Sequence, residues 1–143
     1  MRFEKQKHLD REIRAMVLWA KSIPSENIKK LGPNDIDFLV LSHVSNTKAY
    51  VEVKGRHRTV DNSYPLPIAA RKLVKLYDAL TSDPNAAKAF IIWACDDGII
   101  VGDMDEIVGE AMVGGRPRRP GSANDWEVMV KYNKQRALKK TMY

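Results

Sequence analysis

Three charged residues in the middle of the chain have the types and spacing of a site for metal-dependent hydrolysis. Glu52 and Lys54 are two residues apart in the stretch AYVEVKGR (49–56), and Asp37 lies fifteen residues before Glu52. In a β-strand, residues i and i+2 project to the same face, so Glu52 and Lys54 emerge side by side while Val53 points away. If Asp37 begins a neighbouring strand, both carboxylates meet at one edge of the sheet. There they could hold a divalent ion and activate a water molecule.

The chemistry that suits this set is hydrolysis of a phosphodiester. Mg²⁺ prefers oxygen ligands and typically takes one or two carboxylates together with waters and substrate phosphate. We therefore expect Mg²⁺ at Asp37 and Glu52, with Mn²⁺ able to replace it. Such an ion polarises the phosphate and lowers the pKa of its bound water. Lys54 could orient that water or stabilise transition-state charge, and it could act as a base only with a pKa well below the usual ~10.4.

The bulk composition predicts one domain over residues 1–143 and excludes several classes of protein. Apolar content of 44% and charged content of 29% are ordinary for a globular protein, and no apolar run is long enough to cross a bilayer. The single cysteine, Cys95, lies in the apolar run AFIIWAC (89–95), which fits a buried residue in a reducing compartment. We expect a cytoplasmic protein of a bacterial, archaeal or phage-infected cell. No cysteine or histidine cluster has the spacing of zinc ligands. No glycine-rich phosphate-binding loop is present either, and no organic cofactor is expected.

The net charge of +6 is concentrated at the C-terminal end. Residues 1–115 carry 16 Lys/Arg and 16 Asp/Glu, whereas residues 116–143 carry 8 and 2. Such asymmetry predicts a polyanionic partner, although many basic tails are only solvated surface. Beside an acidic cluster it favours nucleic acid as the partner.

Hydrophobic periodicity predicts an α/β fold of alternating helices and strands. A helix over 4–21 has an apolar stripe at helical spacing, formed by Leu9, Ile13, Met16, Val17 and Ala20. A polar connection (22–34) leads to a strand (36–44), which should pair antiparallel with the strand 49–55. After a polar loop (56–66) comes a helix over 68–80. Its expected inward residues are Leu73, Leu76, Tyr77 and Leu80, and its outward ones are Arg71, Lys72, Lys75 and Asp78.

The second half of the chain adds further strands. A strand over 88–95 turns at Asp97-Gly98 into the strand 99–102. A flexible basic loop (114–124) precedes an edge strand over 126–132, and 133–143 is a basic C-terminal end that could be a frayed helix. The order α-β-β-α-β-β, with the last edge strand, predicts a mixed β-sheet flanked by helices.

With these residues in this order, residues 8–103 resemble the PD-(D/E)XK nuclease superfamily, nearest to its branch of Holliday-junction resolvases and phage nucleases. Members of that branch carry a glutamate in the first helix, an aspartate at a strand start, Glu-X-Lys in the next strand, and then a helix with a basic face. The corresponding positions here are Glu12, Asp37, Glu52-Val53-Lys54 and ARKLVKLYDAL (70–80).

The resemblance implies a restriction-endonuclease-like core and a Mg²⁺-dependent DNA endonuclease, acting on branched or phage recombination DNA. It implies that the Val53 carbonyl adds a third metal ligand, and that Glu12 binds a second ion or a metal-bound water. Three alternatives stay open. Asp35 competes with Asp37 as the metal ligand, Glu12 could instead be a solvated residue paired with His8 or Arg11, and Glu52 with Lys54 could be an ordinary surface ion pair.

Basic residues around this core predict a path for DNA, with phosphate contacts at Arg56, Arg58, Arg71, Lys72, Lys75, Arg116, Arg118 and Arg119. Cleavage of both strands needs two active sites, so a homodimer is plausible, with the edge strand 126–132 as one candidate interface. An alternative function is a catalytically inactive nucleic-acid-binding module with the same fold.

Overall fold

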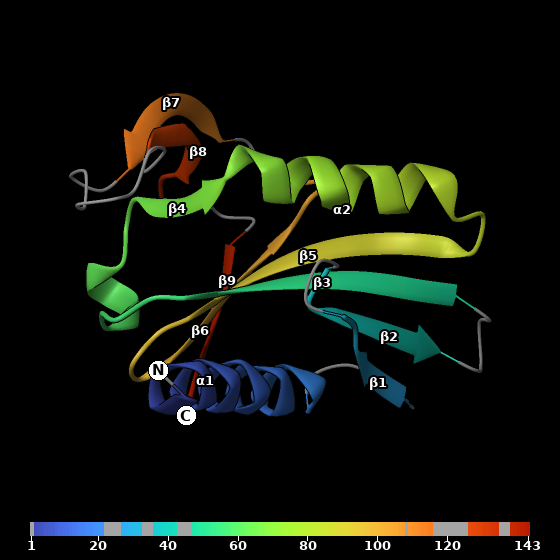
Figure 1. Ribbon diagram of the computed structural model, residues 1–143. Coiled ribbons are helices and arrows are strands. Elements are labelled where there is room, and N and C mark those ends of the chain that lie inside the picture. The colour runs from blue at the N-terminus through green and yellow to red at the C-terminus, as the bar shows by residue number, and fades with distance from the viewer. Residues whose placement is uncertain are drawn as a thin grey trace.

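The computed structural model describes residues 2–21, 27–32, 36–42, 47–107, 109–115, 126–134 and 138–143. Within these ranges the chain forms two α-helices, a mixed six-stranded sheet and a separate three-stranded sheet (Figure 1). The predicted α/β class, with a mixed sheet flanked by helices, is confirmed. The elements are α1 (Arg2–Ala20), β1 (Asn27–Lys30), β2 (Phe38–Ser42), β3 (Thr47–Gly55), a 3₁₀ turn (Val60–Asn62), β4 (Leu66–Ala69), α2 (Ala70–Ser82), β5 (Ala86–Ala94), β6 (Gly98–Asp103), β7 (Glu110–Gly115), β8 (Trp126–Tyr132) and β9 (Leu138–Met142).

The main sheet has the order β1-β2-β3-β5-β6-β9. Strands β1, β2 and β3 are antiparallel neighbours, and β3 then pairs in parallel with β5. A parallel pair requires a crossover connection, which here contains α2. The predicted antiparallel pairing of 36–44 with 49–55 is confirmed, as is the hairpin at Asp97-Gly98 that joins β5 to β6. The two central strands, β3 and β5, therefore carry the residues that both helices cover.

The helices cover opposite faces of this sheet, α1 on one side and α2 on the other (Figure 1). The residues of α1 that are buried are Ala15, Met16 and Trp19, and the Trp19 ring lies 5.1 Å from that of Phe90. The expected stripe is partly wrong, because Ile13 and Val17 are 45% and 53% exposed. The small Ala15 side chain allows close approach to the sheet. The face of α1 that packs on the sheet is therefore the one with Ala15 and Met16, and not the one with Ile13 and Val17. Glu12 lies one turn before Ala15 and Met16, so it also faces the sheet.

Helix α2 packs through Leu76, which is fully buried, and through the half-buried Leu73. Tyr77 was expected to face inward, but it is 61% exposed. Lys72 was expected to face outward, but its ammonium group contacts the buried Glu52. The cluster beneath α2 also contains Cys95, which is buried and free as predicted.

Five strands differ from the sequence prediction. β1 lies in the expected polar connection, and its residues are exposed, so they show no apolar alternation. β9 occupies the expected basic C-terminal end and pairs with β6 at an edge of the main sheet. β4 joins the end of the expected loop (56–66) to the start of the expected helix, so α2 begins at Ala70 and not at Ile68. β4 pairs with β8 in the second sheet, where β8 is the central strand and its other neighbour, β7, was not predicted. The prediction of 126–132 as an edge strand is therefore wrong.

Among the described helices, none is both long and apolar enough to cross a membrane.

Candidate active site

The site is built where β3 extends beyond its neighbour β2. The last pair of the β2–β3 ladder is Phe38 with Val51, so Glu52 and the residues after it have no partner from β2. Asp37 directly precedes Phe38 and lies at this open edge. Its carboxylate takes the place of the missing strand, because the Val53 amide donates to Asp37 Oδ2 at 2.8 Å. The predicted position of Asp37 at a strand start is confirmed.

Asp37 and Glu52 are held together by two reciprocal hydrogen bonds. The Asp37 amide donates to Glu52 Oε2 at 3.2 Å, while Val53, the residue after Glu52, donates to Asp37. Each carboxylate therefore has one oxygen fixed by a backbone amide of the opposite segment. The remaining oxygens, Asp37 Oδ1 and Glu52 Oε1, are the ones that can bind a cation.

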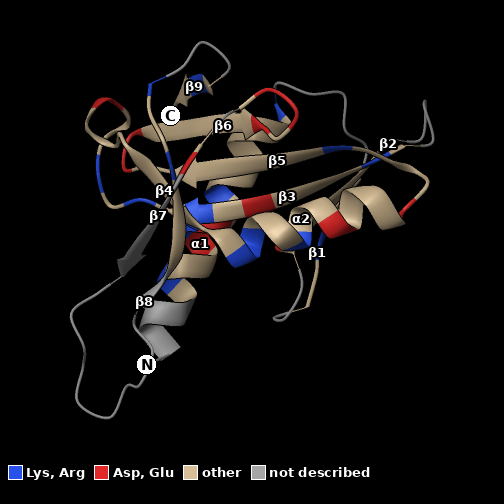
Figure 2. Cartoon of the chain, turned by 90° about the horizontal axis from the view of Figure 1, so that it is seen from above, with Lys and Arg blue, Asp and Glu red and all other residues tan. Residues whose placement is uncertain are grey.

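Each of these remaining oxygens faces a lysine. Lys72 Nζ, from the first turn of α2, lies 2.8 Å from Glu52 Oε1, an ion pair without the angles of a hydrogen bond. Lys30 Nζ, from the end of β1, lies 3.5 Å from Asp37 Oδ1. Figure 2 shows acidic and basic segments of β3 beside basic segments of α2. Each carboxylate oxygen that accepts no backbone hydrogen bond therefore already lies beside a positively charged group.

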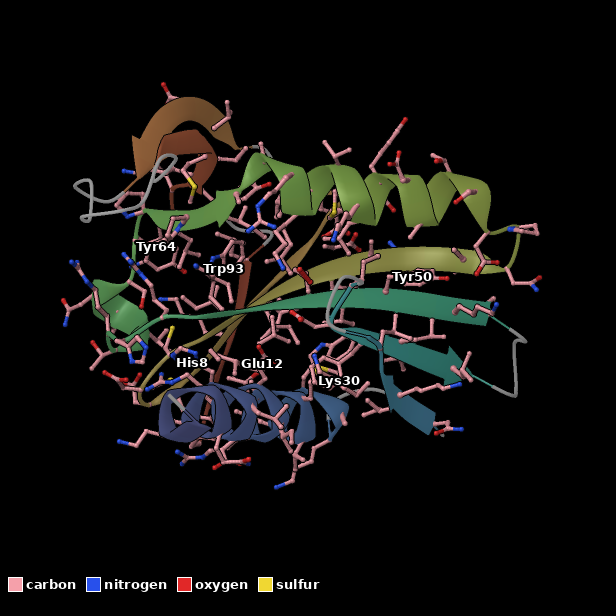
Figure 3. All side chains as sticks on the ribbon, viewed as in Figure 1. His8, Glu12, Lys30, Tyr50, Tyr64 and Trp93 are labelled. Carbon is pink, nitrogen blue, oxygen red and sulfur yellow. The ribbon has the colours of Figure 1, made fainter. Side chains whose placement is uncertain are left out.

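Glu12 reaches the same site from the opposite face of the sheet. Its Oε2 lies 3.6 Å from Lys30 Nζ, so Lys30 bridges Glu12 and Asp37. Figure 3 shows Glu12 on α1 and Lys30 close together between that helix and the sheet. The structure therefore brings the three predicted carboxylates to one region. The alternative pairing of Glu12 with His8 or Arg11 is not the contact seen, since its partner is Lys30.

Burial dominates the electrostatics of the site. Glu52 is only 3% exposed, and burial, followed by the charge of Asp37, raises its pKa to about 7. Burial and then Asp37 also raise the pKa of Glu12, while Lys30 opposes this shift. A buried carboxylate with a raised pKa beside a second carboxylate is typical of functional sites. The alternative that Glu52 and Lys54 form a surface ion pair does not fit a buried Glu52 paired with Lys72.

Two further predicted residues lie on β3. Lys54 is exposed and, as predicted, lies two residues after Glu52 on the same strand. In an antiparallel ladder the N–H and C=O of one residue point to the same side. Because the Val53 amide points to Asp37, the Val53 carbonyl is also directed to the open edge. This direction is compatible with its predicted role as a ligand.

The chemistry of these residues fits one divalent ion better than a larger metal cluster. Within the described ranges, no group of three or more His, Cys, Asp and Glu side chains could hold a metal ion together. Mg²⁺, however, needs only one or two carboxylates with waters and phosphate. Asp37 and Glu52 offer two, and the buried Glu52 Oε1 has no hydrogen bond, only the ion pair with Lys72. These two side chains and the Val53 carbonyl could therefore hold the ion.

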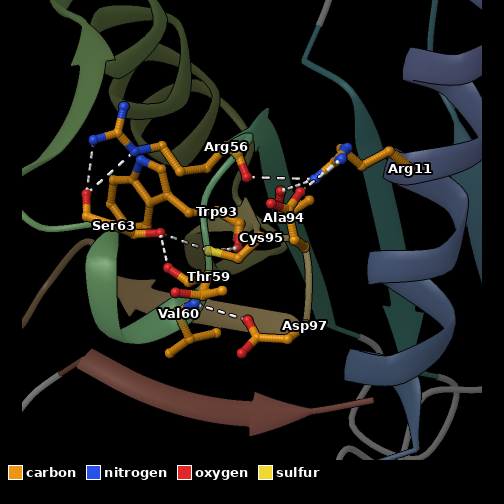
Figure 4. Close-up of polar contacts among 10 residues, drawn as sticks. Arg11, Arg56, Thr59, Val60, Ser63, Trp93, Ala94, Cys95 and Asp97 are labelled. Atoms are coloured by element: carbon orange, nitrogen blue, oxygen red, sulfur yellow. Dashed lines mark hydrogen bonds and ion pairs between the residues drawn. The ribbon is translucent and has the colours of Figure 1, made fainter.

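The residues predicted to contact DNA have different environments. The Arg56 guanidinium stabilises its own loop by donating to the Ser63 carbonyl, and the Arg56 carbonyl accepts from Arg11 of α1 (Figure 4). Arg56 also donates to the Pro65 carbonyl. Arg58 and Arg71 are exposed, Lys75 is half-buried, and Lys72 is paired with Glu52. Asp35 and the three arginines of the basic loop lie outside the described residues.

Sequence reasoning missed Lys30 as a member of the site and placed Lys72 on the wrong side of α2. The signal for Lys72 was available, because it lies one turn before the buried Leu76 and so shares its face. For Lys30 the sequence holds no such signal. Its position depends on β1, whose four residues are all exposed.

Comparison of the chain with protein-family models, with curated proteins and with solved structures finds no match.

Proposed function

We propose that this chain is a Mg²⁺-dependent endodeoxyribonuclease of the PD-(D/E)XK type, with a restriction-endonuclease-like core and a preference for branched or recombination DNA. The observation that carries the proposal is the reciprocal hydrogen bonding of Asp37 and Glu52, which fixes two carboxylates at an open strand edge. The order of site residues supports it. Glu12 is on the first helix, Asp37 precedes β2, Glu52 and Lys54 are on β3, and Lys72 begins the next helix.

The residues of the chain have separate tasks in this proposal. Asp37 and Glu52 would hold the ion, together with the Val53 carbonyl. When bound, the ion polarises the phosphodiester and lowers the pKa of its water. Lys54, exposed on the same strand face as Glu52, orients that water or stabilises charge on the phosphate. Lys72 pairs with Glu52 in the absence of metal. When the metal ion takes its place at Glu52, Lys72 can contact a phosphate oxygen.

One observation favours a second function, that of an inactive nucleic-acid-binding module with this fold. Both free carboxylate oxygens already have a lysine ammonium within 3.5 Å. If these lysines kept the carboxylates paired permanently, the site would take no metal ion, and the chain would bind DNA through its other basic residues without cleaving it. The two functions differ in cleavage and not in binding.

A cleavage assay separates these functions. The purified chain is incubated with linear, supercoiled and four-way-junction DNA in Mg²⁺, in Mn²⁺ and in EDTA. We expect cleavage in both metals and none in EDTA, with the junction cut fastest. Asp37→Asn, purified in parallel, controls for contaminating nucleases and should be inactive. DNA binding without cleavage by the wild-type chain in either metal would favour the inactive module.

A further inference from the structure

Lys30 occupies a position between two carboxylates that come from different elements. Its Nζ lies 3.6 Å from Glu12 Oε2 and 3.5 Å from Asp37 Oδ1. This is the geometry in which one cation bridges two carboxylates. Neither Lys30 nor Glu12 holds the metal ion in the proposed chemistry.

The backbone holds Lys30 at this position from both sides. Lys30 pairs with Phe38 in the β1–β2 ladder, and the next amide, that of Leu31, donates to the Asp37 carbonyl at 3.0 Å. The Lys30 ammonium also lies 4.9 Å from the centre of the Phe38 ring, a favourable cation–π distance. The lysine is therefore fixed to the segment that carries Asp37.

Charge balance limits how many ions the site can take. Glu12, Asp37 and Glu52 contribute three negative charges when ionised, and Lys30 and Lys72 contribute two positive charges, which leaves one negative charge. One divalent ion brings this set to +1, which suits a phosphate. A second would bring it to +3 in a half-buried region.

We infer that Lys30 is a built-in cation that takes the place of a second metal ion between Glu12 and Asp37, so that the site binds a single divalent ion at Asp37 and Glu52. Glu12 is then a positioning residue that holds Lys30 and does not bind metal. This role differs from the expected one, in which Glu12 binds a second ion or its water. The inference rests on the proposed function, because it concerns the metal site of the proposed nuclease.

Counting bound Mn²⁺ tests this inference without any cleavage assay. The full chain is titrated with Mn²⁺, and free Mn²⁺ is measured by electron paramagnetic resonance. The wild-type chain should bind one ion. Lys30→Met removes the competing charge, so the first ion should bind about tenfold more tightly, about 1.4 kcal/mol, and a second ion should bind at higher concentration. Lys30→Arg keeps the charge and should bind one ion.

Two further variants make the result decisive. Lys29→Met removes an exposed lysine from the same strand and should behave as the wild-type chain. Glu12→Gln should still bind one ion, whereas a two-ion site would lose one; this variant also serves if Lys30→Met does not fold. Two ions on the wild-type chain, or identical titrations of Lys30→Met and Lys29→Met, would overturn the inference and leave the proposed function standing. No Mn²⁺ binding by the wild-type chain would overturn both.

Discussion

β3 and α2 carry an ion pair at each end of their contact, and the two pairs differ in how the carboxylate is satisfied. At one end Asp83, which follows α2, accepts three hydrogen bonds: from the Asn85 amide at 2.9 Å, the Tyr50 hydroxyl at 2.9 Å and Lys48 Nζ at 3.1 Å. At the other end Glu52 has one oxygen bound by the Asp37 amide, and its second oxygen faces Lys72 alone.

The pKa values of the two carboxyl groups move in opposite directions. The Asn85 amide, and after it the Tyr50 hydroxyl, lower the pKa of Asp83 because they stabilise its charged form. Burial, and then the charge of Asp37, raise the pKa of Glu52 to about 7. Asp83 joins a helix to a strand, and hydrogen bonds to both of its oxygens already stabilise its charge. Glu52 is buried, and its second oxygen contacts only a cation, so it could bind a metal ion in place of Lys72.

The largest expected effect is on cleavage by Glu52→Gln. This change keeps the size of the side chain but removes a charge that the metal ion needs. A loss of several kcal/mol of transition-state stabilisation corresponds to about a thousandfold or more in rate. Single-turnover cleavage in Mg²⁺ measures this, and DNA binding, measured in Ca²⁺, should survive or tighten.

The matched control for this variant is Asp83→Asn at the other ion pair. It removes the same charge from the same pair of elements, so it should lose stability and keep the wild-type cleavage rate. Equal cleavage by Glu52→Gln and the wild-type chain would mean that the active-site assignment is wrong.

A smaller loss of cleavage is expected for Lys54→Ala. If Lys54 assists the attacking water, its removal should lower the rate by about 10²–10⁴-fold, the usual range for a proton-transfer or orienting group. Mn²⁺ affinity should stay close to that of the wild-type chain. Lys48→Ala, the control at the other end of the same strand, should cleave normally. A parallel loss of Mn²⁺ binding in Lys54→Ala would show that Lys54 maintains the metal site instead.

The two carboxyl groups should also give opposite dependences of stability on pH. The folded chain keeps the Glu52 proton up to about pH 7, whereas an unfolded chain releases it near 4.5. The free energy of unfolding therefore falls as pH rises through this window, by at most about 3 kcal/mol from this group. Glutamine does not titrate, so the free energy of unfolding of Glu52→Gln should not fall in this way. Relative to the wild-type chain, this variant should therefore become more stable from pH 4.5 to 7.

Asp83 has the opposite sign because its pKa in the folded chain is lowered from 3.8. Its stabilisation is present above that value and is lost as the pH falls below it. Asp83→Asn should therefore be less stable than the wild-type chain at neutral pH, and the difference should shrink in acid. Urea unfolding in EDTA over a range of pH measures both variants. The same sign for both would remove the proposed distinction between the two carboxylates.

Much of the central fold could be predicted from local sequence patterns. The paired strands β2 and β3, the helix α2 and the β5–β6 hairpin each have an apolar period or a turn signal within a few residues. The juxtaposition of Asp37 and Glu52 followed from the same patterns, because residues at the start of one strand meet residues near the end of its antiparallel neighbour.

The remaining parts depend on contacts between distant residues. β9 is a strand because it pairs with β6, and β4 is a strand because it pairs with β8; neither has strong alternation of its own. The positions of the lysines in the site could not be predicted for the same reason. Glu52 could be recognised as special from its place between Val51 and Val53, but the pairing of its carboxylate with Lys72 depends on how α2 lies across β3.

The smallest expected effect concerns Tyr50→Phe, which removes only the hydroxyl that donates to Asp83 Oδ2. A hydrogen bond to a charged group stabilises the folded chain, so the free energy of unfolding should fall slightly in urea titration. Tyr77→Phe is the control, since Tyr77 is an exposed tyrosine on α2 and its loss of a hydroxyl should leave stability unchanged. Cleavage should be normal in both variants, because the Tyr50 hydroxyl contacts Asp83 and not the carboxylates of the proposed site. A Tyr50→Phe chain that keeps its stability but cleaves slowly would reverse this assignment and make the Asp83 end part of the active site.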